Sequence, residues 1–314
     1  MNNKKIMILT GSKIGIVCCS NGQKISNSGK IENLKQTLIS IGLLPVFSDY
    51  IYEKEDVFSG SAKERAHALM NFYKDDKIKG IFDISGGDVA NGVLPYLDYE
   101  VIANSSKLFW GYSDLTTVIN AIYAKTGRES VLYQIRNLIY DNSDRQIVDF
   151  CNTVIDSGND MHSIENDMSL EEKTKRSNDL FDIDFKFIQG GEMKGVVVGG
   201  NIRCFLKLAG TEYMPDLSGK ILLLESMSGK PAQMETYLCQ LKQLGVFEKV
   251  AGVLLGTFTE MEREKCKPTI EEIALQLLPE GLPVAVTKDI GHGTDSKAVI
   301  IGQELVLKND VKHF

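Results

Sequence analysis

The stretch LFWGYSDLTTVINAIYA, residues 108–124, carries the clearest structural signal in this chain. Residues 108–112 are mostly apolar or aromatic and predict a short buried strand. From Asp114 to Ala124 apolar residues recur at helical spacing, which predicts a helix. Ser113 lies between the two, so the backbone must turn sharply there from strand to helix.

The same alternation of strand and helix runs through the first half of the chain. Strands are expected over 14–19, 43–47 and 78–84, and helices over 31–41 and 62–73. Strands that alternate with helices pair in parallel through crossover helices. We therefore predict an α/β domain built on a parallel sheet over residues 1–155.

The sequence changes character after residue 155. Residues 156–185 are polar and charged with few apolar anchors, which predicts a linker or a mobile surface excursion. Farther on, strands are expected over 196–198, 221–224, 250–255 and 282–286, with two helices over 202–209 and 233–244. Residues 186–314 are therefore predicted to form a second, strand-rich domain of mixed α/β type.

Composition excludes several classes of protein. With 43% hydrophobic and 25% charged residues, the 314-residue chain is typical of a globular protein with a sizeable core. The net charge of -7 and the absence of a basic stripe argue against nucleic-acid binding. The N-terminal apolar run is too short for a membrane span and lacks a signal cleavage site. The six cysteines show no CxxC pair, which favours a reduced, cytoplasmic protein without a zinc site.

Ser113 is the first candidate for chemistry. A serine on a strand–turn–helix junction projects its hydroxyl from the tip of the turn, as in a nucleophile elbow, with the positive helix N-terminus beneath it. The run Gly111-Tyr112-Ser113-Asp114 lacks the second glycine of Gly-x-Ser-x-Gly, so the motif alone is weak. The alternative is that Ser113 or Asp114 merely caps the helix.

A serine nucleophile needs a base, usually histidine, and the chain has four. His67 lies in a polar helical run, His162 in the charged excursion, and His313 next to the C-terminal residue. His292 lies in Gly291-His292-Gly293, shortly after a predicted strand, where loops commonly carry catalytic groups. His292 is thus the preferred base, with an ordinary turn histidine as the alternative.

An orienting carboxylate is needed next. Glu225 ends the apolar strand Ile221-Leu222-Leu223-Leu224, where a buried carboxylate is costly without a partner. Asp114, Asp289 and Asp295 are rivals. The chain order serine, glutamate, histidine also occurs in α/β-hydrolases, although order alone is weak support.

Glycines after another strand offer backbone donors for an oxyanion. In Ser85-Gly86-Gly87-Asp88, the amides around Gly87 and Asp88 are the candidates, with the amide of Asp114 as a further donor. A dinucleotide-binding loop is the alternative, but the spacing to Gly92 does not fit Gly-x-Gly-x-x-Gly.

Several blocks in order give this chain a family resemblance. They are IKGIF (78–82), SGG (85–87), LPYLDY (94–99), FWGYSDLT (109–116), GGN (199–201), GTE (210–212), LLLE (222–225), QLKQLGVF (240–247), GVLLG (252–256) and GH (291–292). As a set they resemble the LD-carboxypeptidase family of serine peptidases, which includes the microcin C immunity protein. The resemblance covers most of the chain outside residues 156–185.

The resemblance implies a Ser–Glu–His triad, which maps onto Ser113, Glu225 and His292, and an oxyanion hole at Gly87, Asp88 and Asp114. It further implies a flavodoxin-like parallel-sheet N-terminal domain, a smaller swivelling C-terminal domain, a homodimer, and no metal or cofactor. The expected reaction is hydrolysis of the amide between an L-centre and a terminal D-amino acid in murein tetrapeptides, during cell-wall recycling.

Two features leave the substrate open. The stretch 131–137, VLYQIRN, lacks the Gly-Pro that many members have at this point. Residues 156–184 offer only Phe181 as an aromatic that could stack on a nucleotide base. The alternatives are cleavage of a peptidyl- or aminoacyl-nucleotide antibiotic and a non-catalytic binding module. Arg136 or Arg203 could hold the substrate carboxylate, since arginine binds carboxylates bidentately.

Overall fold

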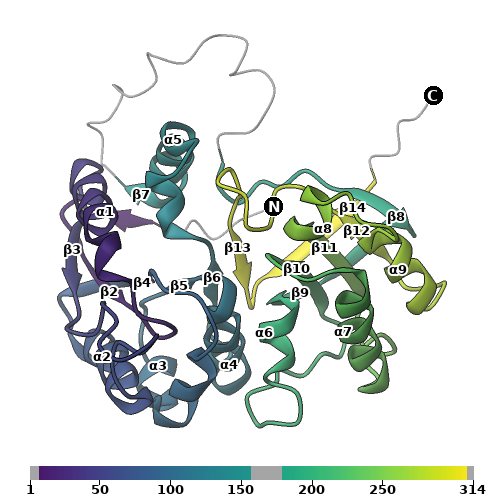
Figure 1. Cartoon of the computed structure of the whole chain (residues 1–314), viewed down its shortest axis with the longest axis horizontal. Coiled ribbons are helices and arrows are strands. Elements are labelled where there is room, and N and C mark those ends of the chain that lie inside the picture. Colours follow the sequence, from purple (N-terminus) through teal and green to yellow (C-terminus); the bar gives the residue numbers. More distant parts are fainter. Residues whose placement is uncertain (1–6, 157–178, 310–314) are drawn as a thin grey trace.

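The computed structural model describes residues 7–156 and 179–309, which form two lobes lying side by side (Figure 1). Each lobe is built on a six-stranded sheet with helices packed on it. A further two-stranded sheet joins β1 (Ile8–Leu9) to β7 (Ile155–Asp156). No helix in the described ranges is long and apolar enough to cross a membrane.

The N-terminal sheet confirms the predicted parallel α/β architecture. Its strands are β2 (Lys13–Val17), β3 (Leu44–Phe47), β4 (Ile78–Asp83), β5 (Phe109–Gly111), β6 (Ser130–Leu132) and β13 (Val299–Ile301), in the order β13-β6-β5-β4-β2-β3. The helices are α1 (Ser28–Ser40), α2 (Ala62–Lys74), α3 (Tyr99–Ala103), α4 (Thr116–Thr126) and α5 (Ser143–Val154). The five parallel strands from β2 to β6 follow the flavodoxin-like order 2-1-3-4-5.

Two apolar clusters cover the two faces of this sheet. On one face α1 and α5 pack through residues such as Leu34 and Phe150. On the other face α2, α3 and α4 pack through residues such as Leu69 and Val118, and this cluster continues into the C-terminal domain. Strands buried on both faces are nearly continuous in hydrophobicity, which explains why the short apolar runs predicted them well.

The C-terminal sheet has a parallel centre and antiparallel edges. Its strands are β8 (Lys186–Gln189), β9 (Glu192–Asn201), β10 (Ile221–Ser226), β11 (Gly252–Phe258), β12 (Val284–Val286) and β14 (Glu304–Lys308). The order is β14-β9-β10-β11-β12-β8, with β14 and β8 antiparallel to their neighbours. A separate strand-rich domain was predicted, and the structure confirms it.

The helices of this domain are α6 (Ile202–Leu206), α7 (Pro231–Gln243), α8 (Thr259–Arg263) and α9 (Ile270–Leu277). The prediction of two helices is therefore wrong, because α8 and α9 were missed. A capping box at the start of α9 gave a signal, since Thr269 and Glu272 each bond to the other's backbone N–H.

The two domains are joined by more than the chain connection between them. β13 comes from the C-terminal part of the sequence but pairs antiparallel with β6 of the N-terminal sheet. The buried Asn120 of α4 bonds to both the N–H and the carbonyl of Gly199 at 2.8 Å each. The amide of Asn201 also donates to Thr116 Oγ1 at 3.0 Å. These bonds dock α4 against the end of β9.

The predicted excursion falls mostly outside the described residues, which resume at residue 179. From there the chain is packed: Leu180 is fully buried and its carbonyl accepts a hydrogen bond from the amide of Ala298. Phe181 lies against Trp110, with ring centroids 6.4 Å apart. Phe181 therefore belongs to the core contacts beneath β5. The domain boundaries at 155 and 186 stay a prediction.

Candidate active site

Ser113 occupies the turn between β5 and α4. The chain leaves β5 extended at Tyr112, then makes a 3₁₀ turn over Ser113–Leu115 that runs into α4. Ser113 has φ +56°, in the left-handed region that costs a non-glycine residue about 1–3 kcal/mol. Such strain persists only where the surrounding packing enforces it, and both neighbours, Tyr112 and Asp114, are buried. The turn predicted from the sequence thus has the backbone of a nucleophile elbow.

Glu225 and His292 meet at the carboxyl ends of the C-terminal strands. Glu225 lies in β10 with no exposed surface, and His292 lies in the loop after β12. His292 Nδ1 is 2.7 Å from Glu225 Oε2, and Asn201 Nδ2 donates to Glu225 Oε1 at 3.2 Å. A buried carboxylate needs such partners, because burial without them is costly. Each oxygen of Glu225 therefore has one donor.

The ring of Tyr112 links this pair to the turn that carries Ser113. Its centroid lies 4.8 Å from that of His292 in an edge-to-face arrangement. Burial, and then the negative charge of Glu225, raise the pKa of Tyr112 well above its usual value, so its hydroxyl stays protonated. His292 Nε2 is buried and has no hydrogen-bond partner among the described residues. The imidazole is thus oriented on one side and available on the other, and it packs against Tyr112, the residue that precedes Ser113.

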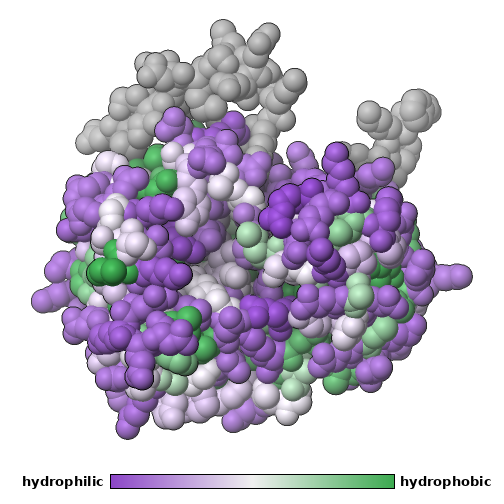
Figure 2. Space-filling model, viewed as in Figure 1, coloured by the Kyte–Doolittle hydropathy of each residue, from purple (hydrophilic) through white to green (hydrophobic). Residues whose placement is uncertain are grey.

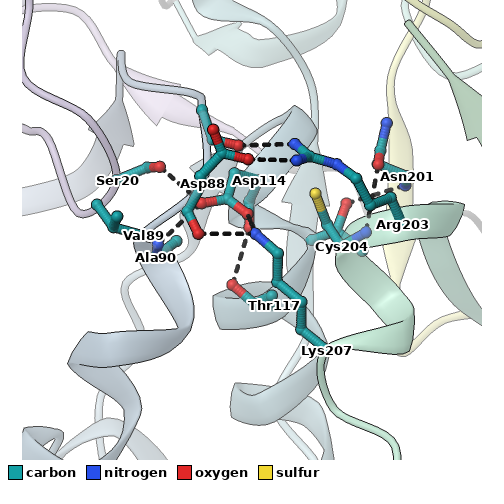
Figure 3. Close-up of polar contacts among 12 residues, drawn as sticks. Ser20, Asp88, Val89, Ala90, Asp114, Thr117, Asn201, Arg203, Cys204 and Lys207 are labelled. Carbon is teal, nitrogen blue, oxygen red and sulfur yellow. Dashed lines mark hydrogen bonds and ion pairs between the residues drawn. The ribbon is translucent and has the colours of Figure 1, made fainter. Parts of the chain in front are cut away.

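The three rival carboxylates are placed differently. Asp114 is fully buried and accepts hydrogen bonds from Ser20 Oγ at 2.6 Å and the Ala90 amide at 2.8 Å, and it pairs with Lys207 (Figure 3). Asp289 accepts from the amide of Asp184 at 2.7 Å. Asp295 lies beside Gly293 in the histidine loop. Glu225 is the carboxylate that the fold brings to Nδ1 of His292.

The glycine loop after β4 approaches Ser113 closely. A Cβ built on Gly86 would lie 3.9 Å from Ser113 Oγ. Gly87 has φ +121°, and a Cβ there would lie 2.2 Å from the Asn21 side chain, so both conformation and space require glycine. The amide of Asp88 already donates to Asn21 Oδ1 at 3.0 Å. Of the proposed oxyanion donors, Asp88 is therefore engaged in this structure, and Gly87 and Asp114 remain the candidates.

The two arginines considered for the substrate carboxylate have partners within the protein. Arg203 pairs with the Asp88 carboxylate and donates from Nη2 to the Gly87 carbonyl at 2.9 Å (Figure 3). Arg136 donates to Gln134 and Gln23, both at 3.4 Å, and lies 5.9 Å from the ring centre of Tyr140. The contacts of Arg136 are long, so it stays a candidate, whereas the guanidinium of Arg203 is used by the glycine loop.

Three residues at the site were not anticipated. Asn201 orients Glu225 and also caps α6, since its Oδ1 accepts from the Cys204 amide at 3.3 Å. Asparagine at a strand end before a helical run was the available signal for it. Tyr112 and Lys207 carried no local signal, because their partners are distant in sequence. In the same view as Figure 1, Figure 2 shows a hollow between the two lobes that is bordered largely by hydrophilic residues.

The described residues contain no group of three or more histidine, cysteine, aspartate or glutamate side chains arranged to hold a metal ion. What they do contain is a buried carboxylate–imidazole pair beside a strained serine turn, set between two mostly parallel sheets. This combination defines a class of hydrolase-like α/β proteins with a site at a domain junction.

Comparison with known proteins narrows the class to a family. Residues 14–133 match the model of the LD-carboxypeptidase N-terminal domain, and residues 194–307 match that of the LD-carboxypeptidase C-terminal domain. The chain belongs to the LD-carboxypeptidase family, a family of peptidases.

Three curated relatives illustrate the range of this family. A putative carboxypeptidase of Treponema pallidum is 28% identical over 316 residues, covering 98% of this chain and 93% of the relative. The microcin C7 self-immunity protein MccF of Escherichia coli is 30% identical over 271 residues, covering 81% and 78%. A probable murein peptide carboxypeptidase of Bacillus subtilis is 24% identical over 315 residues, covering 99% and 93%.

Solved structures of the same family share the fold. Wild-type MccF in the apo state superposes with a TM-score of 0.77 at 23% identity, covering 95% of this chain and 93% of that one. A muramoyltetrapeptide carboxypeptidase from Oxalobacter formigenes superposes with a TM-score of 0.70 at 22% identity, covering 95% of each chain. Both likenesses establish the two-domain architecture.

Proposed function

We propose that this protein is a serine carboxypeptidase that hydrolyses the amide between an L-centre and a terminal D-amino acid in murein tetrapeptides. The observation that carries the proposal is the Glu225–His292 pair, 2.7 Å apart, packed on Tyr112 next to the strained Ser113. Relatives named as murein peptide and muramoyltetrapeptide carboxypeptidases support the substrate class.

In the proposed mechanism Ser113 Oγ attacks the carbonyl carbon of the scissile amide, and His292 Nε2 takes the hydroxyl proton. Glu225 holds Nδ1 and stabilises the imidazolium that forms. The N–H groups of Gly87 and Asp114 stabilise the negative oxygen of the tetrahedral intermediate. His292 then returns its proton to the leaving amine, and the D-amino acid departs.

Water completes the cycle by hydrolysing the acyl-enzyme on Ser113, with His292 again acting as base and then as acid. The hydrogen bond from Ser113 to His292 is not formed in this structure, since Nε2 has no partner among the residues that the structure describes. Such bonds are often long in the free enzyme and tighten when substrate binds. The proposal therefore expects substrate binding to bring the two side chains together.

The test is to incubate the purified protein with a murein tetrapeptide that ends in D-alanine and to measure D-alanine release. A matched peptide ending in L-alanine is the control, since the proposal requires selectivity for the D-centre. Release of D-alanine from the first peptide, with no release of L-alanine from the control peptide, supports the proposal. No turnover of the D-peptide by correctly folded protein would contradict it.

A second candidate is cleavage of a peptidyl- or aminoacyl-nucleotide antibiotic. The 30% identity to MccF favours it, and solved MccF structures contain glutamyl sulfamoyl guanosine and aspartyl sulfamoyl adenosine. The packing of Phe181 against Trp110 counts against it, because this aromatic is held away from any role as a base-stacking group. Incubation with an aminoacyl-sulfamoyl nucleotide distinguishes the two substrates.

If the native protein turns over neither substrate but binds one of them, a non-catalytic binding module becomes the better description. The six cysteines, all unpaired thiols, fit the reducing cytoplasm, where we propose that the protein acts. A homodimer and a swivelling C-terminal domain stay predictions, which light scattering and solution X-ray scattering with and without substrate test.

A further inference from the structure

The loop of residues 85–90, here called the Gly87 loop, is held from two opposite sides. On the N-terminal side Asn21 makes two hydrogen bonds to it. Its backbone N–H donates to the Gly86 carbonyl at 3.2 Å, and its side-chain Oδ1 accepts from the backbone N–H of Asp88 at 3.0 Å. The loop follows β4 at the point where the strand order of the sheet reverses between β2 and β4, a usual place for ligand binding in such sheets.

On the opposite side two cations from the C-terminal domain reach the same loop (Figure 3). Arg203 of α6 donates from Nη2 to the Gly87 carbonyl at 2.9 Å and pairs with the Asp88 carboxylate. Lys207, just after α6, donates to the Asp88 carbonyl at 2.8 Å and pairs with the buried Asp114. Three successive carbonyls of the Gly87 loop therefore have donors, two of them from the other domain.

These bonds fix where the loop amides point. A peptide unit is planar and trans, so each carbonyl and the following N–H point in opposite directions. The bond from Asn21 to the Gly86 carbonyl therefore turns the Gly87 N–H away from Asn21. The bond from Arg203 to the Gly87 carbonyl likewise keeps the Asp88 N–H on Asn21. Glycine at Gly87 resists a peptide flip only weakly, so external bonds must hold the conformation.

Charge alone does not explain the arrangement. The side chains of Arg203 and Asp88 are 42% and 61% exposed, and ion pairs of this kind contribute little stability. What distinguishes Arg203 is that its guanidinium spans a side-chain carboxylate and a backbone carbonyl of the same loop at once. A planar fork suits this double contact, and a lysine at position 203 would lack it.

We infer that Arg203 and Lys207 are positioning residues that hold the Gly87 loop in its oxyanion-binding conformation from the other domain. Arg203 accordingly does not bind the carboxylate of the substrate. The catalytic consequence rests on the proposed function, whereas the holding of the loop does not. Closure of the two domains and assembly of the oxyanion hole then become one event, because the loop is complete only when α6 is docked.

The first test is kinetic, with Arg203→Met and the conservative Arg203→Lys assayed on the D-alanine tetrapeptide. We expect kcat to fall about tenfold to a hundredfold in Arg203→Met, which is less than the loss of a whole oxyanion donor, while KM changes less than about twofold. Arg203→Lys should recover only part of kcat. A rise in KM with kcat preserved would instead make Arg203 a substrate ligand and overturn the inference.

The matched control is Arg263→Gln, which removes an exposed arginine of α8 paired with Glu264. Lys194→Arg, from the exposed Lys194–Glu304 pair, is the control for Lys207→Arg, which keeps the charge beside Asp114. Both controls should leave kcat and KM as in the native protein. Native kcat in Arg203→Met would overturn the inference.

The second test needs no turnover and therefore separates this inference from the proposed function. Hydrogen–deuterium exchange of the full-length protein reports the bond from the Asp88 amide to Asn21. We expect exchange in a peptide covering residues 85–92 to be at least about tenfold faster in Arg203→Met than in the native protein or Arg263→Gln. Unchanged exchange overturns the inference, whatever the substrate proves to be.

Discussion

The two domains contribute to the site in different ways, although both place it at the carboxyl ends of parallel strands. The N-terminal sheet supplies backbone in unusual conformations: Ser113 is strained at φ +56°, and Gly87 has φ +121°, which glycine adopts readily. The C-terminal sheet supplies charged and ionisable side chains: the buried Glu225, His292, and the cations Arg203 and Lys207. Neither domain contains the proposed nucleophile, base and carboxylate together, so the candidate site exists only where the domains meet.

The difference shows how each domain tolerates an unfavourable group. Strain at Ser113 is tolerated because Asp114 behind it is bonded to two loops and to Lys207. The buried charge of Glu225 is tolerated because His292 and Asn201 supply one hydrogen bond to each oxygen. Substitutions that affect catalysis and stability separately can therefore be made in one domain at a time.

The largest effect is expected from Ser113→Ala, which removes the proposed nucleophile and leaves the turn. D-alanine release should fall more than about 10³-fold, because the remaining groups cannot form an acyl-enzyme. The melting temperature should stay near that of the native protein, since alanine carries the same backbone strain. D-alanine release that persists at the native rate would remove Ser113 from the mechanism.

Glu225→Gln tests the contribution of the C-terminal domain. We expect kcat to fall about 10²–10⁴-fold with little change in KM, because an amide at this position neither stabilises an imidazolium nor favours the required tautomer. Steady-state kinetics measure this, with the exposed Glu304→Gln as the matched control. If Glu225→Gln retains native kcat, one of the aspartates takes the orienting role instead.

Asn120→Ala tests the contact between the domains, away from the proposed chemistry. Asn120 satisfies both the N–H and the carbonyl of Gly199, and removing it leaves two buried backbone groups without partners. We expect the free energy of unfolding to fall by about 2–3 kcal/mol. Urea denaturation measures it, and a midpoint equal to that of the native protein would mean that the domains dock without this bond.

The smallest effect is expected from Ser113→Gly. Glycine adopts a positive φ without a steric penalty, but it gains more freedom in the unfolded chain, so the net stabilisation should be about 0.5–1 kcal/mol. Urea denaturation of Ser113→Gly and Ser113→Ala compares their free energies of unfolding. The difference reports the backbone strain, since both variants lack the hydroxyl. Equal stability of the two variants would show that Ser113 is not strained in solution.

Much of the fold follows from local sequence patterns. Strands such as β4 and β10 are short apolar runs, and helices such as α2 have an apolar face and a capping box at Ser61 and Glu64. The missed α8 is a single short segment of five residues, Thr259–Arg263, whose pattern is too brief to distinguish from a loop. β13 was missed because its partner β6 lies about half the chain away in sequence.

The sequence by itself determined the turn at Ser113, the alternation of strands and helices, and the preference for His292 among four histidines. Only the tertiary structure decided that the Glu225 carboxylate reaches His292, that the Asp88 amide is already engaged, and that Arg203 binds the Gly87 loop. The physical reason is the distance along the sequence between the residues that interact. Turns and helices depend on neighbouring residues, whereas each of these contacts joins residues between 67 and 116 positions apart, and so depends on how whole sheets and domains pack.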